Sequence, residues 1–567
     1  MTRWILSWET TPRLILLSIL LGLIGGFGAL IFLWMLHIVA QWLLTPLSGY
    51  RFLTVHEAAQ GVIPPQHWFW LLPLATGLGG LLAGLLVYSF APEAEGHGTD
   101  AAVRAFHLGQ RIRGRIPLVK SVASALTIGS GGSAGREGPT AQIAAGLGSV
   151  IGGLLELPEE EQRILILAGM AAGLSGIFKS PLGTAIFAVE ILYSSMAFES
   201  GALVYTILSA GTAYALVGIF DGWTPLFILP PTAQFQAINL PWYAVLGLLA
   251  GLLGAIYPGI FYGVRDAFRR LRLPPHLKPA LGGLAVGLGG ILLPQLLGGG
   301  YGWMELALEG RIAIGLALLL ALGKIVALSL TIGSGGSGGV FAPSLYIGAM
   351  LGAGMAGLLH LILPVAPNPT AFAVVGMAAL FAGAARVPIA NLIMVTEMTG
   401  GYQLILPTML AVAIAFIIQE RLTRHARYPT LYEAQVPRPT ESPAHRKSYY
   451  ELAAHLLRQG VFRLDPDLLS QELQEELEQG TPIPLAGEGN ERTFLYSIPL
   501  DPNSPLAGRR LSECNLKGIL IVGILREGQV ILPHGGTHLQ QGDLLLVASR
   551  PHELAESPLA SSAPPPS

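Results

Sequence analysis

The sequence is short of charge and of cysteine, and each shortage excludes a class of protein. Charged residues make up 12% of the 567 residues, about half the share that a soluble globular protein carries. Cys514 is the single cysteine, so a disulfide framework and a cysteine-based metal cluster are excluded. The formal net charge of -2 gives no sign of a nucleic-acid partner, and we expect none.

Apolar residues take the place of the missing charge and make up 52% of the chain. A helix needs roughly 20 apolar residues to cross a bilayer. Runs of this kind begin at Leu14, Trp70, Trp242, Ala280 and Ile312. The first run is too long for the core of a signal peptide and no small-residue cleavage site follows it, so we expect a retained helix. The sequence therefore predicts an integral, multi-pass membrane protein, with the lipid bilayer as its surroundings.

Three clusters of basic residues indicate how the chain is oriented in the membrane. They lie at 111–120, 265–278 and 421–447. Lys and Arg gather in cytoplasmic loops. We therefore place these clusters, the N-terminus and the C-terminal part of the chain in the cytoplasm.

One glycine-rich string is written twice. From Thr127 the chain reads TIGSGGSAGREGP, and from Thr331 it reads TIGSGGSGGVFAP. Lys120 falls on Lys324 in the same register, and the string GMAA follows in both copies. The apolar region is therefore an internal duplication.

Duplicated halves are a transporter architecture in which the repeats often pack with inverted topology. Here they are expected to cover about 70–220 and 280–430. The glycine-rich strings sit between apolar segments, and non-helical backbone at that depth is tolerated only against protein or a water-filled cavity. We expect the two strings to break two helices around one site. A pair of surface loops is the alternative.

The chemistry of two broken helices favours a negatively charged guest. Helix N-termini present unpaired N–H groups and a partial positive charge, and glycine lets the backbone approach a ligand closely. A cation site would instead need carboxylates or rings of carbonyls. The second string carries Val340 and Phe341 where the first carries Arg136 and Glu137.

The quoted strings resemble motifs of the CLC family of chloride channels and chloride/proton exchangers, over roughly residues 10–435. GREGP, Gly135–Pro139, is intact, and GVFAP, Gly339–Pro343, fits the second motif. GHGTD, Gly96–Asp100, is an altered form of the third. The resemblance implies an all-α membrane domain with an inverted repeat and broken helices. It also implies a homodimer with one pore in each subunit, and bound chloride ions but no other cofactor.

The resemblance implies roles for individual residues. Glu137 matches the family's gating glutamate. The expected anion-binding set is His97, Gly98, Gly135, Arg136, Gly138, Val340, Phe341 and Tyr432. Tyr428 is the rival of Tyr432. His97 stands where the family often has serine, and it can donate a hydrogen bond or become charged. Asp100 is expected to cap the short helix that follows it.

A second, inner glutamate carries protons in the family's exchangers. In this sequence its position falls on Ile191, beside Glu190. Isoleucine cannot carry a proton, so the sequence favours passive, channel-like conduction, voltage-gated as in many family members, with chloride/proton exchange as the alternative. Glu190 has a repeat mate in Glu397, which suggests a structural pairing common to both halves.

The C-terminal part changes composition. A linker with two short amphipathic helices is expected over 436–492, a small α+β domain over 493–556 and a disordered tail over 557–567. The strands of this domain are expected to turn at 526–529 and 540–543. The domain resembles the TrkA-C regulatory domain of bacterial potassium-uptake proteins, which suggests a bacterial inner membrane. Such domains dimerise or bind a small ligand, here unknown. No G-x-G-x-x-G string precedes it, so NAD is not implied.

The sequence disfavours two other classes of function, a cation transporter and an intramembrane enzyme. A cation transporter with the same tail would need carboxylates at both broken helices, and the second helix has none. An intramembrane enzyme would need a nucleophile–base pair or a set of metal ligands, and the 13 histidines form no HExxH string. We therefore expect no enzymatic activity and no metal site.

Overall fold

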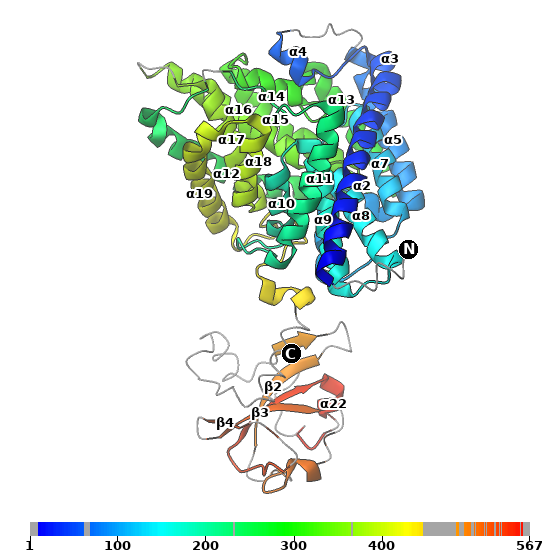
Figure 1. Cartoon of the computed structure of the whole chain (residues 1–567), viewed down its shortest axis with the longest axis vertical. Coiled ribbons are helices and arrows are strands. Elements are labelled where there is room, and N and C mark those ends of the chain that lie inside the picture. Colours follow the sequence, from blue (N-terminus) through cyan, green and yellow to red (C-terminus); the bar gives the residue numbers. More distant parts are fainter. Residues whose placement is uncertain are drawn as a thin grey trace. The chain divides into compact units, whose positions relative to one another are not determined.

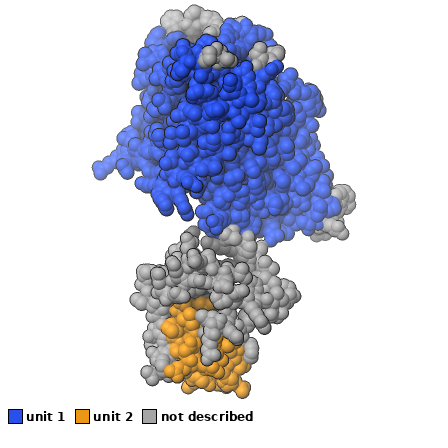
Figure 2. Space-filling view, turned by 90° about the vertical axis from the view of Figure 1, so that its left-hand side faces the viewer, with its two compact units in different colours: residues 1–446 blue, residues 447–567 orange. Residues whose placement is uncertain are grey.

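The computed structural model describes residues 10–61, 69–230, 233–363, 367–445 and, with short gaps, 483–559. The chain divides into two compact units, residues 1–446 and 447–567 (Figures 1 and 2). The two short helices expected at 449–461 and 467–479 lie outside the described residues.

The first unit is all-α (Figure 1). Its first half contains α2 (Thr10–Val39), α3 (Thr45–Ser48), α4 (Val55–Ala59), α5 (Leu72–Phe90), α6 (Thr99–Leu108), α7 (Arg115–Gly129), α8 (Glu137–Leu154), α9 (Glu159–Phe178), α10 (Pro181–Glu190) and α11 (Leu203–Asp221). Its second half contains α12 (Leu240–Arg270), α13 (Lys278–Leu292), α14 (Tyr301–Leu308), α15 (Ile314–Gly333), α16 (Phe341–His360), α17 (Pro369–Ala385), α18 (Pro388–Thr399) and α19 (Ile405–Thr423). Among the described helices, seven segments are long and apolar enough to cross a membrane.

The duplication extends further than the sequence predicted. Helices α5 to α11 have counterparts in α13 to α19, in the same order. The long helices α2 and α12 precede the two series, so each half begins well before residues 70 and 280. The strings alone missed this because α2 and α12 share length and apolar composition rather than a motif.

Both glycine-rich strings interrupt a helix, as predicted. The breaks separate α7 from α8 and α15 from α16. Gly131 and Gly335 hold the same place in the two strings, with φ of 107° and 101°, a region that side chains with a Cβ rarely adopt. The two halves also bind each other here: Thr331 Oγ1 accepts from the amide of Ser133 at 3.0 Å.

Two buried lysines fold a loop back in each half. Lys120 Nζ donates to the carbonyl oxygen of Gly96 at 2.7 Å, and Lys324 Nζ donates to that of Gly298 at 2.7 Å. Both lysine side chains are buried, so each carbonyl partner offsets part of the cost of removing an ammonium group from water. The lysines therefore fix the loops that precede α6 and α14.

A pair of glutamates, the buried Glu190 and the partly buried Glu397, caps helices across the repeat. Glu190, at the end of α10, accepts from the amides of Ile389 at 3.1 Å and Ala390 at 2.7 Å at the start of α18. Glu397, near the end of α18, accepts from the amide of Gly183 at 2.9 Å in the first turn of α10. The structural pairing suggested by the sequence is present, and each carboxylate lies at a helix N-terminus that favours it.

The second unit contains a five-stranded antiparallel sheet of order β1-β2-β5-β3-β4. The strands are β1 (Ile483–Ala486), β2 (Thr493–Pro499), β3 (Leu520–Arg526), β4 (Gln529–Ile531) and β5 (Leu544–Ser549). Arg526 pairs with Gln529, so the predicted hairpin between β3 and β4 is present. Asp543 ties the second predicted turn to β3, since its carboxylate accepts from Arg526 at 2.7 and 2.8 Å.

The predicted domain boundaries need three corrections. Residues 436–445 belong to the first unit rather than to a linker, because Ser442 Oγ hydrogen-bonds His107 Nδ1 at 2.7 Å and Arg163 donates to the carbonyl of Ala444 at 2.8 Å. Strand β1 falls within the predicted linker at 436–492, but it pairs with β2 and therefore belongs to the sheet of the second unit. Leu559, assigned to the disordered tail, is buried in the core of the second unit, while 560–567 lie outside the described residues.

Replacing Glu190 with alanine is expected to lower the free energy of unfolding by about 1–3 kcal/mol, because one buried and one partly buried amide lose their acceptor. Thermal unfolding of the purified protein in detergent measures the change. Glu160→Ala, an exposed carboxylate in the first turn of α9, is the control and should leave the midpoint unchanged. Equal midpoints for the two variants would contradict the cap.

Candidate functional site

The two glycine-rich strings meet at Gly135 and Gly339, the fourth pair of glycines that align between them. The amide of Gly135 donates to the carbonyl of Gly339 at 2.8 Å, and the amide of Gly339 donates back at 2.6 Å. This two-bond bridge joins the segments that lead into α8 and α16. The convergence predicted from the sequence is therefore present, and the alternative of two separate surface loops is wrong.

A small cavity, here called the central cavity, lies where α8 and α16 begin. It is lined by Thr99, Glu137, Gly138, Leu174, Phe187, Val340, Phe341 and Tyr432. Its volume is about 10 Å³, which is roughly the room that one water-sized particle takes. Of the two tyrosines that the sequence offers, Tyr432 lines this cavity. Tyr428 does not line it, and its hydroxyl donates to Asp266 at 2.8 Å.

The polar groups of the central cavity suit an anion. The amides of Val340 and Phe341 take part in no hydrogen bond within the described part of the chain. They stand at the N-terminus of α16, a helix of 20 residues, where the helix dipole favours negative charge. Around them are the hydroxyls of Thr99 and Tyr432 and aromatic rings.

The carboxylate of Glu137 reaches the same helix start. One oxygen accepts from the amide of Ala342 at 3.4 Å, and the other accepts from the hydroxyl of Tyr301. Glu137 is 1% exposed and forms no ion pair within the described residues. A buried carboxylate held by an amide and a hydroxyl resembles an anion bound at a helix N-terminus.

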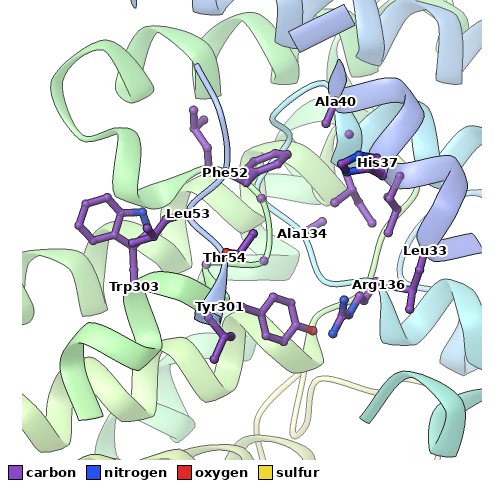
Figure 3. A pocket seen from close by; sticks show the side chains of 18 of the residues that line it. Leu33, His37, Ala40, Phe52, Leu53, Thr54, Ala134, Arg136, Tyr301 and Trp303 are labelled. Atoms are coloured by element: carbon purple, nitrogen blue, oxygen red, sulfur yellow. The ribbon is translucent and has the colours of Figure 1, made fainter. Parts of the chain in front are cut away.

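A second hollow, here called the outer cavity, has a volume of about 310 Å³ and is lined in part by Arg136, the residue before Glu137. Figure 3 shows Arg136 and Tyr301 side by side in its lining, with His37 from the last turns of α2 nearby. The guanidinium carbon of Arg136 lies 4.3 Å from the centroid of the Tyr301 ring, a cation–π contact. The side chain of Arg136 therefore faces the outer cavity rather than the central one.

A third hollow, here called the inner cavity, has a volume of about 440 Å³. Its lining includes five arginines: Arg104, Arg111, Arg113, Arg265 and Arg269. Four of these arginines, all but Arg104, belong to the basic clusters that the sequence predicts to be cytoplasmic. The outer cavity is lined instead by Leu33, Leu36 and His37 from the last turns of α2.

The altered motif GHGTD lies between the inner and central cavities. His97 and Gly98 line the inner cavity, while Thr99 lines the central one. The predicted role of His97 and Gly98 in anion binding therefore concerns the inner cavity rather than the central one. Asp100 was expected to cap α6, but α6 has no side-chain cap. The carboxylate of Asp100 instead accepts from the amide of Ala434 at 3.1 Å.

The two residues considered for an inner proton path lie away from all three cavities. Ile191 is buried at the end of α10, and Glu190 is engaged in capping α18. Neither side chain lines the outer, central or inner cavity.

Sequence reasoning missed Thr99 and Tyr301. The signal was in the repeat: the loop fixed by Lys324 ends in Gly298–Tyr301, which falls on Gly96–Thr99, the loop fixed by Lys120. Each half therefore presents one hydroxyl at the start of a short helix, Thr99 toward the central cavity and Tyr301 toward Glu137.

Comparisons with known proteins agree with this geometry. The model of the family "Voltage gated chloride channel" matches residues 79–420, and the TrkA-C domain model matches 495–556. A putative chloride channel protein, ClcB-like, of Ralstonia nicotianae is 35% identical over 377 residues, covering 65% of this chain and 86% of the relative. The H(+)/Cl(-) exchange transporter ClcA of Salmonella paratyphi A is 32% identical, covering 65% and 80%.

Solved structures are also similar. A slow cyanobacterial Cl-/H+ antiporter is 27% identical with a TM-score of 0.64, covering 75% of this chain and 97% of that one. A CLC-type fluoride/proton antiporter is 24% identical with a TM-score of 0.63, covering 75% and 98%, and shows the same fold.

Replacing Gly138 with alanine is expected to weaken anion binding by about tenfold or more, which corresponds to about 1.4 kcal/mol. The added Cβ would press on the carbonyl oxygen of His97 and lie 2.9 Å from Cα of Gly339. Calorimetric titration with chloride measures the affinity. Gly211→Ala, in α11 with nothing within 4 Å, is the control. Unchanged affinity in Gly138→Ala would show that the close packing of the two motifs does not shape the site.

Proposed function

Because the chain belongs to the voltage-gated chloride channel (CLC) family and is an integral, multi-pass membrane protein, we propose that it exchanges chloride for protons across the membrane. Ile191 led us to favour passive conduction from the sequence. The relatives that are named exchangers or antiporters support the alternative instead. We further propose a homodimer with a pore in each subunit, in a bacterial inner membrane.

The observation that carries the proposal is the position of the Glu137 carboxylate at the start of α16. An ionised carboxylate and a chloride ion compete for the same N–H groups and the same helix dipole. Protonation removes the charge of the carboxylate and with it the attraction that holds the side chain at the start of α16. A proton binding to Glu137 therefore favours entry of an anion, and the two fluxes become linked.

The three cavities give the anion a path with Glu137 at its narrowest part. The arginines of the inner cavity attract anions from the cytoplasm. Arg136 does the same in the outer cavity, where it lies beside Tyr301. Between them the central cavity offers amides and hydroxyls but no charged group besides Glu137, so a chloride ion meets no fixed cation that would hold it too tightly.

Substituting Glu137 with glutamine is expected to abolish proton movement while chloride still flows, because the amide cannot take up a proton. Proteoliposomes with a chloride gradient and a pH indicator measure both fluxes. Glu190→Gln, a buried carboxylate that contacts backbone amides only in the described structure, should keep the proton flux. If Glu137→Gln moved protons uphill like the unmodified protein, Glu137 would not be the coupling group.

Replacing Tyr301 with phenylalanine is expected to raise chloride flux at neutral pH by about threefold to tenfold. The variant loses the hydroxyl that donates to the Glu137 carboxylate, and a hydrogen bond to a charged group contributes about 1.5–3 kcal/mol. The gate then leaves its closed position more often. Initial rates of chloride efflux from proteoliposomes test this.

Tyr346→Phe is the matched control, since that hydroxyl donates to the carbonyl of Gln295 at 3.2 Å and makes no contact with Glu137 among the described residues. A flux increase of the same size in both variants would show that Tyr301 acts on packing rather than on the gate.

A further inference from the structure

The ring of His97 occupies the boundary between the inner and central cavities. It lines the inner cavity, and its edge packs against the ring of Tyr432 with centroids 5.3 Å apart. Tyr432 in turn lines the central cavity together with Glu137. His97 is only 7% exposed, so it is a nearly buried imidazole between the inner cavity and the cavity that contains Glu137.

The two nitrogens of this ring are in different states. Nε2 lies 3.1 Å from an oxygen of Asp100. The Asp100 carboxylate also accepts from the amides of Glu433 at 3.2 Å and Ala434 at 3.1 Å, so both of its oxygens act as hydrogen-bond acceptors. An accepting oxygen pairs with an N–H group, so the hydrogen of the neutral ring is assigned to Nε2. Nδ1 then carries a free lone pair.

Nδ1 has no hydrogen-bond partner in the described structure although it is buried. A buried acceptor without a donor costs free energy, so an unpaired lone pair of this kind marks Nδ1 as a candidate for the chemistry of the site. The lone pair can take up a proton, and the resulting imidazolium would be balanced by the adjacent carboxylate of Asp100.

The charged groups around the ring allow this change. The carboxylates at the inner cavity are Glu93, Glu95, Asp100 and Glu433. The cations are Arg104, Arg111, Arg113, Arg265 and Arg269, with Lys120 behind the loop. The phenols that face the ring are Tyr262 and Tyr432.

Two carboxylates of the cavity already have a cationic partner. Partial burial alone would raise the pKa of Glu93, but its hydrogen bonds, one of them from Arg113, have the larger effect and lower that pKa below its usual value. Glu93 is therefore ionised, and it forms an ion pair with Arg113. Arg265 forms an ion pair with Glu433. Asp100 is therefore the counter-ion at hydrogen-bond distance from the ring.

We propose that His97 is the group that passes protons between the inner cavity and the central cavity, a role that rests on the proposed chloride/proton exchange. A hydrated proton that enters from the inner cavity binds Nδ1, where an N–H bond forms and neutral water is left behind. That bond then breaks, and the proton passes through a water molecule in the central cavity to the Glu137 carboxylate. The ring returns to its neutral form, and no electrons are exchanged.

This assignment accounts for the isoleucine at position 191. Ile191 cannot hold a proton, and Glu190 is committed to two amides of α18. Neither lines a cavity, whereas His97 lines one and contacts a residue of the next. Proton transfer thus takes the same opening as the anion on the cytoplasmic side.

The test compares His97→Gln with His107→Gln in proteoliposomes with a chloride gradient. The glutamine amide can still donate to Asp100 but cannot take up a proton. We expect the number of protons moved per chloride to fall at least tenfold in His97→Gln while chloride flux continues. His107 is the control, because both its ring nitrogens are engaged, with Ser442 at 2.7 Å and with the carbonyl of Leu192 at 3.0 Å. Its variant should keep the ratio.

His97→Ser tests the same loss with a small side chain, should the glutamine variant not fold. An unchanged ratio in the folded His97 variants, with loss of coupling in Glu137→Gln, would overturn the role of His97 and leave the exchange function standing. No uphill proton movement by the unmodified protein would overturn the exchange function itself, together with this proposal.

Discussion

The contact between the Glu137 carboxylate and the amide of Ala342 is the interaction on which the rest of the account depends. It joins the start of α8 to the start of α16, so it requires both helices to begin at the same place. Besides the hydroxyl of Tyr301, what supports it belongs to the backbone of the two halves: the bridge between Gly135 and Gly339 and the left-handed turns at Gly131 and Gly335. The site is thus built mainly from amides that lack partners, and one side chain supplies the charge.

The duplication explains how a chain with so little charge holds an anion site in place. Each stabilising device is made twice, once in each half: a buried lysine that fixes a loop, a glutamate that caps a helix of the other half, and a threonine that accepts from the opposite string. The halves differ where function requires it. Glu137 has Phe341 as its counterpart, so only one of the two helix starts carries a carboxylate.

Much of this arrangement was predictable from the sequence, because it is written as local pattern. The breaks, the pairing of Glu190 with Glu397 and the strands of the C-terminal domain all follow from glycine, proline and apolar spacing. Three features did not. The place of Asp100 depends on residues 433 and 434, which are far away in the chain. The contact of Tyr301 with the gate and the position of His97 depend on how loops fold back onto buried lysines.

The central claim is that the Glu137 carboxylate and chloride compete for one helix start. By linkage, chloride that displaces an ionised carboxylate must raise the protonation of Glu137, so binding takes up protons. The most direct measurement is calorimetric titration of the purified protein with chloride in buffers of different ionisation enthalpy at neutral pH. The account predicts proton uptake on chloride binding that disappears in Glu137→Gln. Chloride binding without proton uptake, or uptake that persists in that variant, would contradict it.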